Sequence, residues 1–149
     1  MNFPVGEVIG KGSSPFDLMT EARKLNGSKF NGYIILAVRG NFIEEGALFF
    51  RDGEVIACAV ECLASDKLIK GKEALEFFGN ETKGVGFYQE VSLTKSQVDL
   101  ILAFDEKLLA GEIDLKDIPR IIPSAFSRRF SGIEEQKNAL DAYGLGDLK

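Results

Sequence analysis

Residues 32–61 constrain the fold more than any other part of the chain. They read "GYIILAVRGNFIEEGALFFRDGEVIACAVE", three runs of apolar residues separated by the turn signals Gly40-Asn41 and Asp52-Gly53. Asp-Gly between two apolar runs is a strong signal for a two-residue hairpin turn. The segment therefore predicts three antiparallel strands in a meander, which need further strands or a packed helix to be stable.

The expected strands of this meander span residues 32–40, 42–50 and 54–61. A fourth strand is expected over residues 85–93, "VGFYQEVSL", because aromatic and β-branched residues are concentrated there. The third strand carries the small side chains of Ala57 and Ala59. Small residues on a sheet let a helix lie close to it, and the helix expected just after the meander is the candidate.

Helical patterns flank the meander on both sides. Ser14 is expected to cap a first helix, which Asn26-Gly27 would end. Residues 66–80, "DKLIKGKEALEFFGN", predict a second helix with apolar residues on one side. Gly71 lies inside that pattern, where it marks either a close approach or a break.

A third helix is expected from residue 94 onward. Thr94 and Gln97 have the spacing of a capping box, which marks a helix start. Leu100 and Phe104 widen its apolar arc beyond what one surface face needs. Such a helix is either buried between two layers or used in a contact with a partner.

These elements predict an α+β fold with one antiparallel sheet, made of the three-strand meander plus at least one further strand. Helices pack on this sheet, and the C-terminal segment is helical. The chain has 149 residues, which is enough to bury a core without disulfides or metals. We expect a single domain over residues 1–149, with the sheet-containing core in 1–93 and the helical segment in 94–149.

The chain contains no histidine, and this absence excludes most familiar catalytic sites. The Ser-His-Asp arrangement, the usual zinc hydrolases and the commonest general base all require one. Cys58 and Cys62 would lie about 13 Å apart on one strand, too far for a disulfide, and two thiolates do not complete a zinc site. We expect core cysteines, no enzyme activity, no cofactor and no metal.

The overall charge narrows the range of partners. A formal net charge of −5 makes a nucleic-acid partner unlikely, because such proteins present a basic face. The opening "MNFPVGEVIGKGSS" lacks the features of a signal peptide. No apolar run approaches the roughly 18 residues of a membrane span. We expect a cytoplasmic protein without a membrane partner.

One glycine-rich segment resembles a phosphate loop. In "GEVIGKGSS", residues 6–14, the glycine spacing departs from the phosphate-loop pattern. A helix is nevertheless expected to follow, and helix N-termini attract anions. The candidate anion-binding residues are Lys11, Gly12 and Ser13.

The C-terminal part contains a second candidate site. In "PRIIPSAFSRRF", residues 119–130, a basic cluster is mixed with apolar residues. Arg and Phe are enriched at interface cores, although a cation cluster at a helix end with core phenylalanines is the simpler explanation of these residues. The candidate interaction residues are Ile121, Ile122, Phe126, Arg128, Arg129 and Phe130. A last helix is expected from Ser131 to Tyr143.

The segment "EGALFFRDGEVIA", followed by a helix with "KEALEFF", resembles the PATAN-like domains of bacterial response regulators. It is more similar still to a group of uncharacterised archaeal proteins with a related module. The hairpin positions that carry the resemblance are Gly46, Leu48, Phe50, Gly53, Val55 and Ala57. The opening "FPVG" and the closing "LDAYGL" extend it over nearly the whole chain. The resemblance implies an interaction or regulatory role.

We therefore expect a non-enzymatic interaction or regulatory module with a protein partner, and a homodimer is one form of it. Two alternatives stay open. The first is a roadblock-like regulator of a small GTPase, which needs a continuous five-strand sheet with the first and last helices on the same side. The second is a binder of a small ligand or anion through the loop at residues 11–14.

Overall fold

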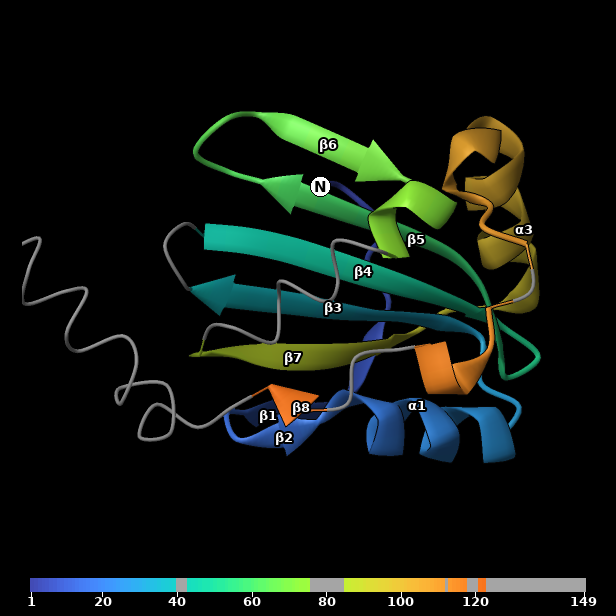
Figure 1. The fold of residues 1–149 in the computed structure, drawn as a ribbon. Coiled ribbons are helices and arrows are strands. Elements are labelled where there is room, and N and C mark those ends of the chain that lie inside the picture. The colour runs from blue at the N-terminus through green and yellow to red at the C-terminus, as the bar shows by residue number, and fades with distance from the viewer. Residues whose placement is uncertain (40–42, 76–84, 112, 118–120, 123–149) are drawn as a thin grey trace, which may run out of the picture.

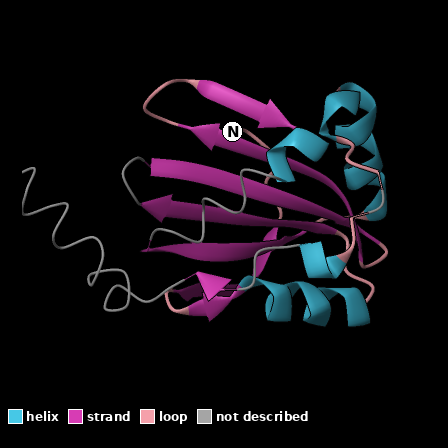
Figure 2. Cartoon of the chain, in the orientation of Figure 1, coloured by secondary structure: helices cyan, strands magenta, loops and turns pink. Residues whose placement is uncertain are grey.

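One antiparallel sheet forms the centre of the protein. The structure, a computed structural model, describes residues 1–39, 43–75, 85–111, 113–117 and 121–122. Six strands pair in the order β1-β7-β3-β4-β5-β6, as Figure 1 shows. Every pairing in this sheet is antiparallel, and helices accompany it (Figure 2). The predicted α+β class is confirmed.

The predicted meander is present. It comprises β3 (Gly32–Arg39), β4 (Ile43–Arg51) and β5 (Glu54–Cys62). Asp52 and Gly53 join β4 to β5 with φ angles of 51° and 85°, the positive values that a two-residue hairpin turn requires. The expected fourth strand, β7 (Val85–Ser92), pairs with β3 on the side away from β4.

The prediction of one helix over residues 66–80 is wrong in its first part. Residues 67–70 form β6 (Lys67–Lys70), an edge strand on β5, and the helical residues described after it are 72–75. Gly71 separates the two with a φ of 74°, a conformation that ends either element. A Cβ there would lie 2.7 Å from the carbonyl oxygen of Lys107, so glycine also permits a close approach.

The start of the chain also differs from the prediction. Residues 7–13 form β1 (Glu7–Ser13), which pairs with β7, and β2 (Phe16–Asp17) leads directly into α1 (Leu18–Gly27). The side chain of Asp17 caps α1 by accepting from the Thr20 amide, so the expected Ser14 cap is wrong. Ser14 instead joins the sheet edge, because its hydroxyl exchanges two hydrogen bonds with the Gly86 backbone.

The third helix begins as predicted. In α3 (Lys95–Phe104), both halves of the capping box between Thr94 and Gln97 are formed. Two short 3₁₀ turns follow, η1 (Glu106–Leu108) and η2 (Leu115–Asp117), and then β8 (Ile121–Ile122), which pairs with β2. The helix expected from Ser131 lies outside the described residues.

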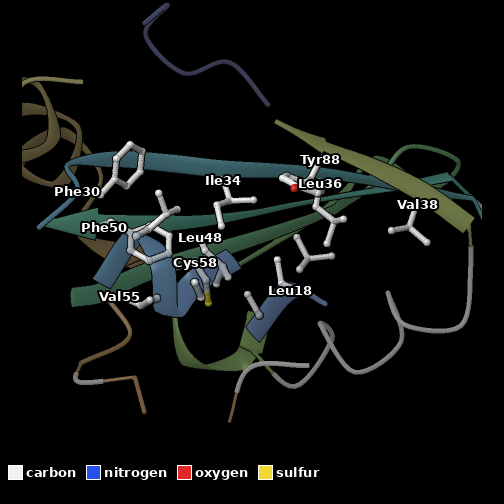
Figure 3. Close-up of a cluster of buried hydrophobic side chains, with 14 of the residues drawn as sticks. Leu18, Phe30, Ile34, Leu36, Val38, Leu48, Phe50, Val55, Cys58 and Tyr88 are labelled. Atoms are coloured by element: carbon white, nitrogen blue, oxygen red, sulfur yellow. The ribbon is translucent and has the colours of Figure 1, made fainter. Parts of the chain in front are cut away.

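The two faces of the sheet have separate cores. Leu18, Ala22 and Leu25 of α1 cover one face, which we call the α1 face. Its strand side chains are mostly large, and Figure 3 shows them together. They include Ile34, Leu36, Leu48, Phe50, Cys58, Val60 and Tyr88.

The opposite face, the α3 face, is covered by Val98 and Leu102 of α3 and by Leu108 of η1. Its strand residues include three fully buried alanines, Ala47, Ala57 and Ala59, together with the large side chains of Tyr33 and Phe49. The small residues therefore make room for α3 and η1, not for the helix expected over residues 66–80. The roadblock alternative depends on the side on which the last helix lies, and that helix is outside the described residues, so this alternative stays a prediction.

Candidate functional site

The structure places two of the predicted C-terminal interaction residues. Ile121 and Ile122 form β8 and pair with Asp17 and Phe16 of β2. The other four predicted residues lie outside the described ranges: Phe126, Arg128, Arg129 and Phe130. The predicted surface is therefore not assembled in the described part of the chain, and it stays a prediction.

The predicted anion-binding residues are not in a loop. Lys11, Gly12 and Ser13 lie in β1, opposite Gln89, Tyr88 and Phe87 of β7. A Cβ on Gly12 would lie 2.6 Å from Cε1 of Tyr88, so this glycine leaves space for a ring and not for a phosphate. The expectation of a loop before a helix is wrong, and anion binding by these residues stays a prediction.

An uncharged face of α3 points away from the sheet. Leu100 is 57% exposed and Phe104 is 85% exposed, while Val98 on the other side is fully buried. Ser96 and Ala103 are exposed too. Residues three and four apart share one face of a helix, so these four side chains form a continuous strip. We call Ser96, Leu100, Ala103 and Phe104 the α3 stripe.

The charged side chains next to the stripe are paired with the β4–β5 hairpin. Lys95 Nζ contacts Asp52 Oδ2 at 2.6 Å, and Asp99 Oδ1 contacts Arg51 Nε at 3.1 Å. The hydrogen bond from Lys95 holds the pKa of Asp52 below its usual value. These contacts orient α3 on the sheet and turn its charges toward the hairpin, which leaves the stripe apolar.

A groove of about 400 Å³ runs beside the stripe, between α3 and the N-terminal segment. Its lining includes Phe3, Pro4, Leu100, Ile101, Phe104 and Leu108. The N-terminal wall is fixed, because the Phe3 ring packs edge-on against Phe49 with 4.8 Å between centroids. The Tyr33 hydroxyl also donates to the Pro4 carbonyl oxygen at 3.1 Å. Groove and stripe form one mostly apolar surface. The groove lining also includes the polar residues Asn2, Gln97 and Asp105, of which Asp105 is paired with Lys70.

A buried carboxyl group lies under α1, apart from the α3 stripe and its groove. Glu90 of β7 is 7% exposed, and among the described residues it is the one charged residue that is buried. Its Oε1 is buried and has no hydrogen-bond partner in the described part of the chain. Gly10 of β1 lies opposite, and a Cβ there would be 2.4 Å from Glu90 Oε2. Glycine therefore makes the space that the carboxyl group occupies.

Glu21 of α1 interacts with Glu90, and the pKa values of the two carboxyl groups are shifted in opposite directions. Burial, together with the hydrogen bond and the charge of Glu21, raises the pKa of Glu90 to about 7. Burial also raises the pKa of Glu21, but hydrogen bonds from Lys24, Glu90 and Tyr88 outweigh it and the net pKa is lowered. Lys24 Nζ lies 2.9 Å from Glu21 Oε2.

The chemistry that these arrangements permit is limited. A carboxylic acid with a pKa near 7 suits proton transfer, but Glu90 is covered by α1 and by the β1 edge strand. Within the described ranges, no group of three or more His, Cys, Asp or Glu side chains could hold a metal ion. Likewise, no helix among the described residues is long and apolar enough to cross a membrane.

The comparisons with known proteins identify one family. The family described as "Uncharacterized protein conserved in archaea (DUF2226)" matches residues 1–105, which include the whole six-stranded sheet and α3. This chain belongs to that family. Neither the curated proteins nor the solved structures contain a match. The resemblance to uncharacterised archaeal proteins is confirmed, whereas the likeness to PATAN-like domains stays a prediction.

Of the α3 stripe and the buried Glu90, only the stripe had a signal in the sequence. Leu100 and Phe104 widened the apolar arc of α3, and the structure leaves both exposed. Glu90 was missed. It is the single acid in the otherwise uncharged strand "VGFYQEVS", on the same face as Tyr88, and that position could have indicated a buried carboxyl group.

Proposed function

We propose that this member of the archaeal family is a non-enzymatic protein-interaction module, and that the α3 stripe with its groove is the surface through which two copies associate. The observation that supports the proposal best is the 85% exposure of Phe104 at the edge of an apolar groove. A large aromatic side chain in water is costly, and contiguous exposed apolar surface marks interaction sites.

A second copy is the partner that fits this surface. The stripe supplies a protruding aromatic side chain, and the groove of about 400 Å³ next to it is large enough to receive one. A twofold axis lets the same patch serve both subunits, so that Phe104 of each copy enters the groove of the other. Aromatic anchors in pockets are the usual centres of such interfaces.

The absence of charge on the stripe also supports association between identical surfaces. Two copies meeting through a charged stripe would bring like charges together. Here the neighbouring Lys95 and Asp99 are paired with the β4–β5 hairpin of their own chain. No comparable observation among the described residues favours a GTPase regulator or an anion binder. A place in the cytoplasm stays a prediction.

The test is the oligomeric state of the full chain, measured by sedimentation over a wide range of protein concentration. Wild type is expected to form a reversible dimer. Phe104→Ser should weaken the dimer about a thousandfold, because both copies lose a hot-spot side chain worth about 2 kcal/mol each.

Phe87→Ser is the matched control. Phe87 lies on β7, is 55% exposed, and is outside the stripe and the groove lining. This variant should dimerise like wild type. A wild-type protein that stays monomeric throughout, or a Phe104→Ser dimer as tight as the wild-type dimer, would contradict the proposal.

A further inference from the structure

The buried carboxyl group of Glu90 is unusual in two respects. The protein leaves space for it, but it does not give both of its oxygens a hydrogen-bond partner among the described residues. Glycine at position 10 keeps β1 clear of Oε2, and Oε1 lacks a partner among the described residues. Burying an ionised carboxylate without full pairing is costly, so such groups normally stay neutral. This feature is independent of the α3 stripe, which lies on the other side of the sheet.

The groups around Glu90 come from four elements. From α1, Glu21 faces it, and Lys24 is paired with Glu21. From β7 itself, Tyr88 lies two residues away on the same face, and its ring packs against Phe16 at 4.7 Å. From β1 and β3, the residues opposite Glu90 are Gly10 and Ile34, neither of which titrates.

We propose that Glu90 and Glu21 form a proton-dependent clamp, in which one shared proton fastens α1 to the sheet and its loss loosens the helix. With Glu90 protonated, its O–H donates to the Glu21 carboxylate, and Lys24 balances the single negative charge. When the proton leaves for solvent, two carboxylates face each other across the α1–sheet contact, and Lys24 is paired with only one of them, Glu21.

Loosening α1 affects more than the helix itself. The helix contacts η2 and β8 in addition to the sheet. The chain continues from β8 into residues 123–149, which include the predicted residues Phe126, Arg128, Arg129 and Phe130. Within the described residues, loosening of α1 therefore also affects its contacts with η2 and β8.

The direction of the pH effect follows from the pKa of Glu90. The pKa is about 7 with α1 closed, and the ordinary value of 4.5 applies once opening exposes the group to water. Between these two pH values, opening releases one proton, so the opening equilibrium constant rises up to about tenfold per pH unit. Below pH 4.5 and above pH 7 this dependence levels off. The clamp is thus tight in mild acid and loose at neutral pH.

The chain suits a clean test because it has no histidine, the side chain that ordinarily titrates in this range. The experiment is hydrogen exchange of the full chain from pH 5 to pH 8, with protection factors corrected for intrinsic exchange rates. We expect α1 amides to lose protection as the pH rises toward about 7, while amides of β3, β4 and β5 keep theirs. Glu90→Gln, which stays neutral, should abolish the loss.

Glu44→Gln is the matched control. Burial raises the pKa of Glu44 as well, but this residue lies on β4 and is not among the groups that shift the pKa of Glu90. The variant should keep the wild-type loss of α1 protection. A pH profile of α1 that is the same in wild type and Glu90→Gln would overturn the clamp. So would equal losses in α1 and in the central strands, because they indicate a general loss of stability.

A second variant keeps the test decisive if Glu90→Gln does not fold. Glu21→Gln removes the opposing charge, so Glu90 should ionise at a lower pH than in wild type. The loss of α1 protection should then level off at a lower pH as well. The side-chain carboxyl carbon of Glu90, followed by NMR, reports the same change. A midpoint that Glu21→Gln leaves unmoved would contradict a shared proton.

Discussion

The two faces of the sheet are built in opposite ways. On the α1 face, large side chains such as Leu48 and Phe50 fill the space under the helix, and a carboxyl pair lies within the same contact. On the α3 face, alanines at positions 47, 57 and 59 let α3 and η1 approach closely. Ala57 even forms a backbone bridge with Leu109. Large side chains and a carboxyl pair therefore lie under α1, whereas small side chains lie under α3 and η1.

This difference matches the functions proposed for the two helices. A helix that presents a binding surface needs a rigid support, and α3 has one in the small-residue packing and its ion pairs with the β4–β5 hairpin. A helix that responds to protonation needs a contact with two states of similar free energy. The pair of Glu21 and Glu90 supplies such a contact for α1.

The largest expected effect is on the α1 face. Leu48 is 1% exposed and belongs to the core under α1. Leu48→Ala removes buried methyl groups and leaves a cavity, so the free energy of unfolding should fall by about 2–5 kcal/mol. Denaturant titration of the purified variant measures this loss. A loss well under 1 kcal/mol would mean that the face is not tightly packed.

The reverse substitution tests the neighbouring residue on the α3 face. Ala47 is fully buried in the core that α3 and η1 cover. Ala47→Leu should therefore lower the free energy of unfolding by about 1–3 kcal/mol through overpacking. The same titration checks it. If the added side chain stabilises the protein, the close approach of α3 and η1 is not what keeps this position small.

The smallest effect on stability is expected from substituting the cysteines. Their reactivity toward thiol reagents tests whether Cys58 lies in the core. Cys58 is buried, and its Sγ donates to the Gly71 carbonyl oxygen at 2.9 Å. Burial raises the pKa of Cys58 to about 12 from 9.0, which lowers the reactive thiolate fraction about a thousandfold. Cys62 is partly exposed.

In the folded protein, thiol labelling followed by mass spectrometry should therefore modify Cys62 and spare Cys58. Cys62→Ser should show no rapid labelling, while Cys58→Ser should label like wild type. Fast modification of Cys58 in the folded Cys62→Ser variant would remove it from the core.

Much of the fold could be predicted from local signals. Asp52-Gly53 defines the hairpin because its positive φ angles suit few other residues, and the capping box at Thr94 defines the start of α3. The strands of the meander are predictable because both of their faces are buried, which gives nearly continuous apolar runs.

The edge strands could not be predicted in the same way. β1 is mostly exposed, and Gly10 and Gly12 within it are determined by the side chains of Glu90 and Tyr88 on β7, not by local preference. The helical spacing of "KLIKGKEAL" predicts a helix where β6 lies. Gly71 interrupts that pattern through its positive φ and its close approach to the backbone of Lys107, neither of which the spacing reveals.

The candidate sites depended on tertiary structure to different degrees. The width of the apolar arc on α3 was visible in sequence, but whether Leu100 and Phe104 were covered depended on the rest of the fold. The meeting of Glu21 with Glu90 joins residues 69 positions apart, 90 minus 21, and only the packing of α1 on β7 brings them together. No spacing rule connects such residues.

The central claim is that Phe104 of one copy enters the groove of another. An isotope-filtered nuclear Overhauser spectrum tests it directly, on a dimer mixed from labelled and unlabelled full-length chains. We predict contacts from the Phe104 ring of one copy to Pro4 or Leu108 of the other, two residues that line the groove. A dimer in which Phe104 shows no contact to the other copy would contradict the account.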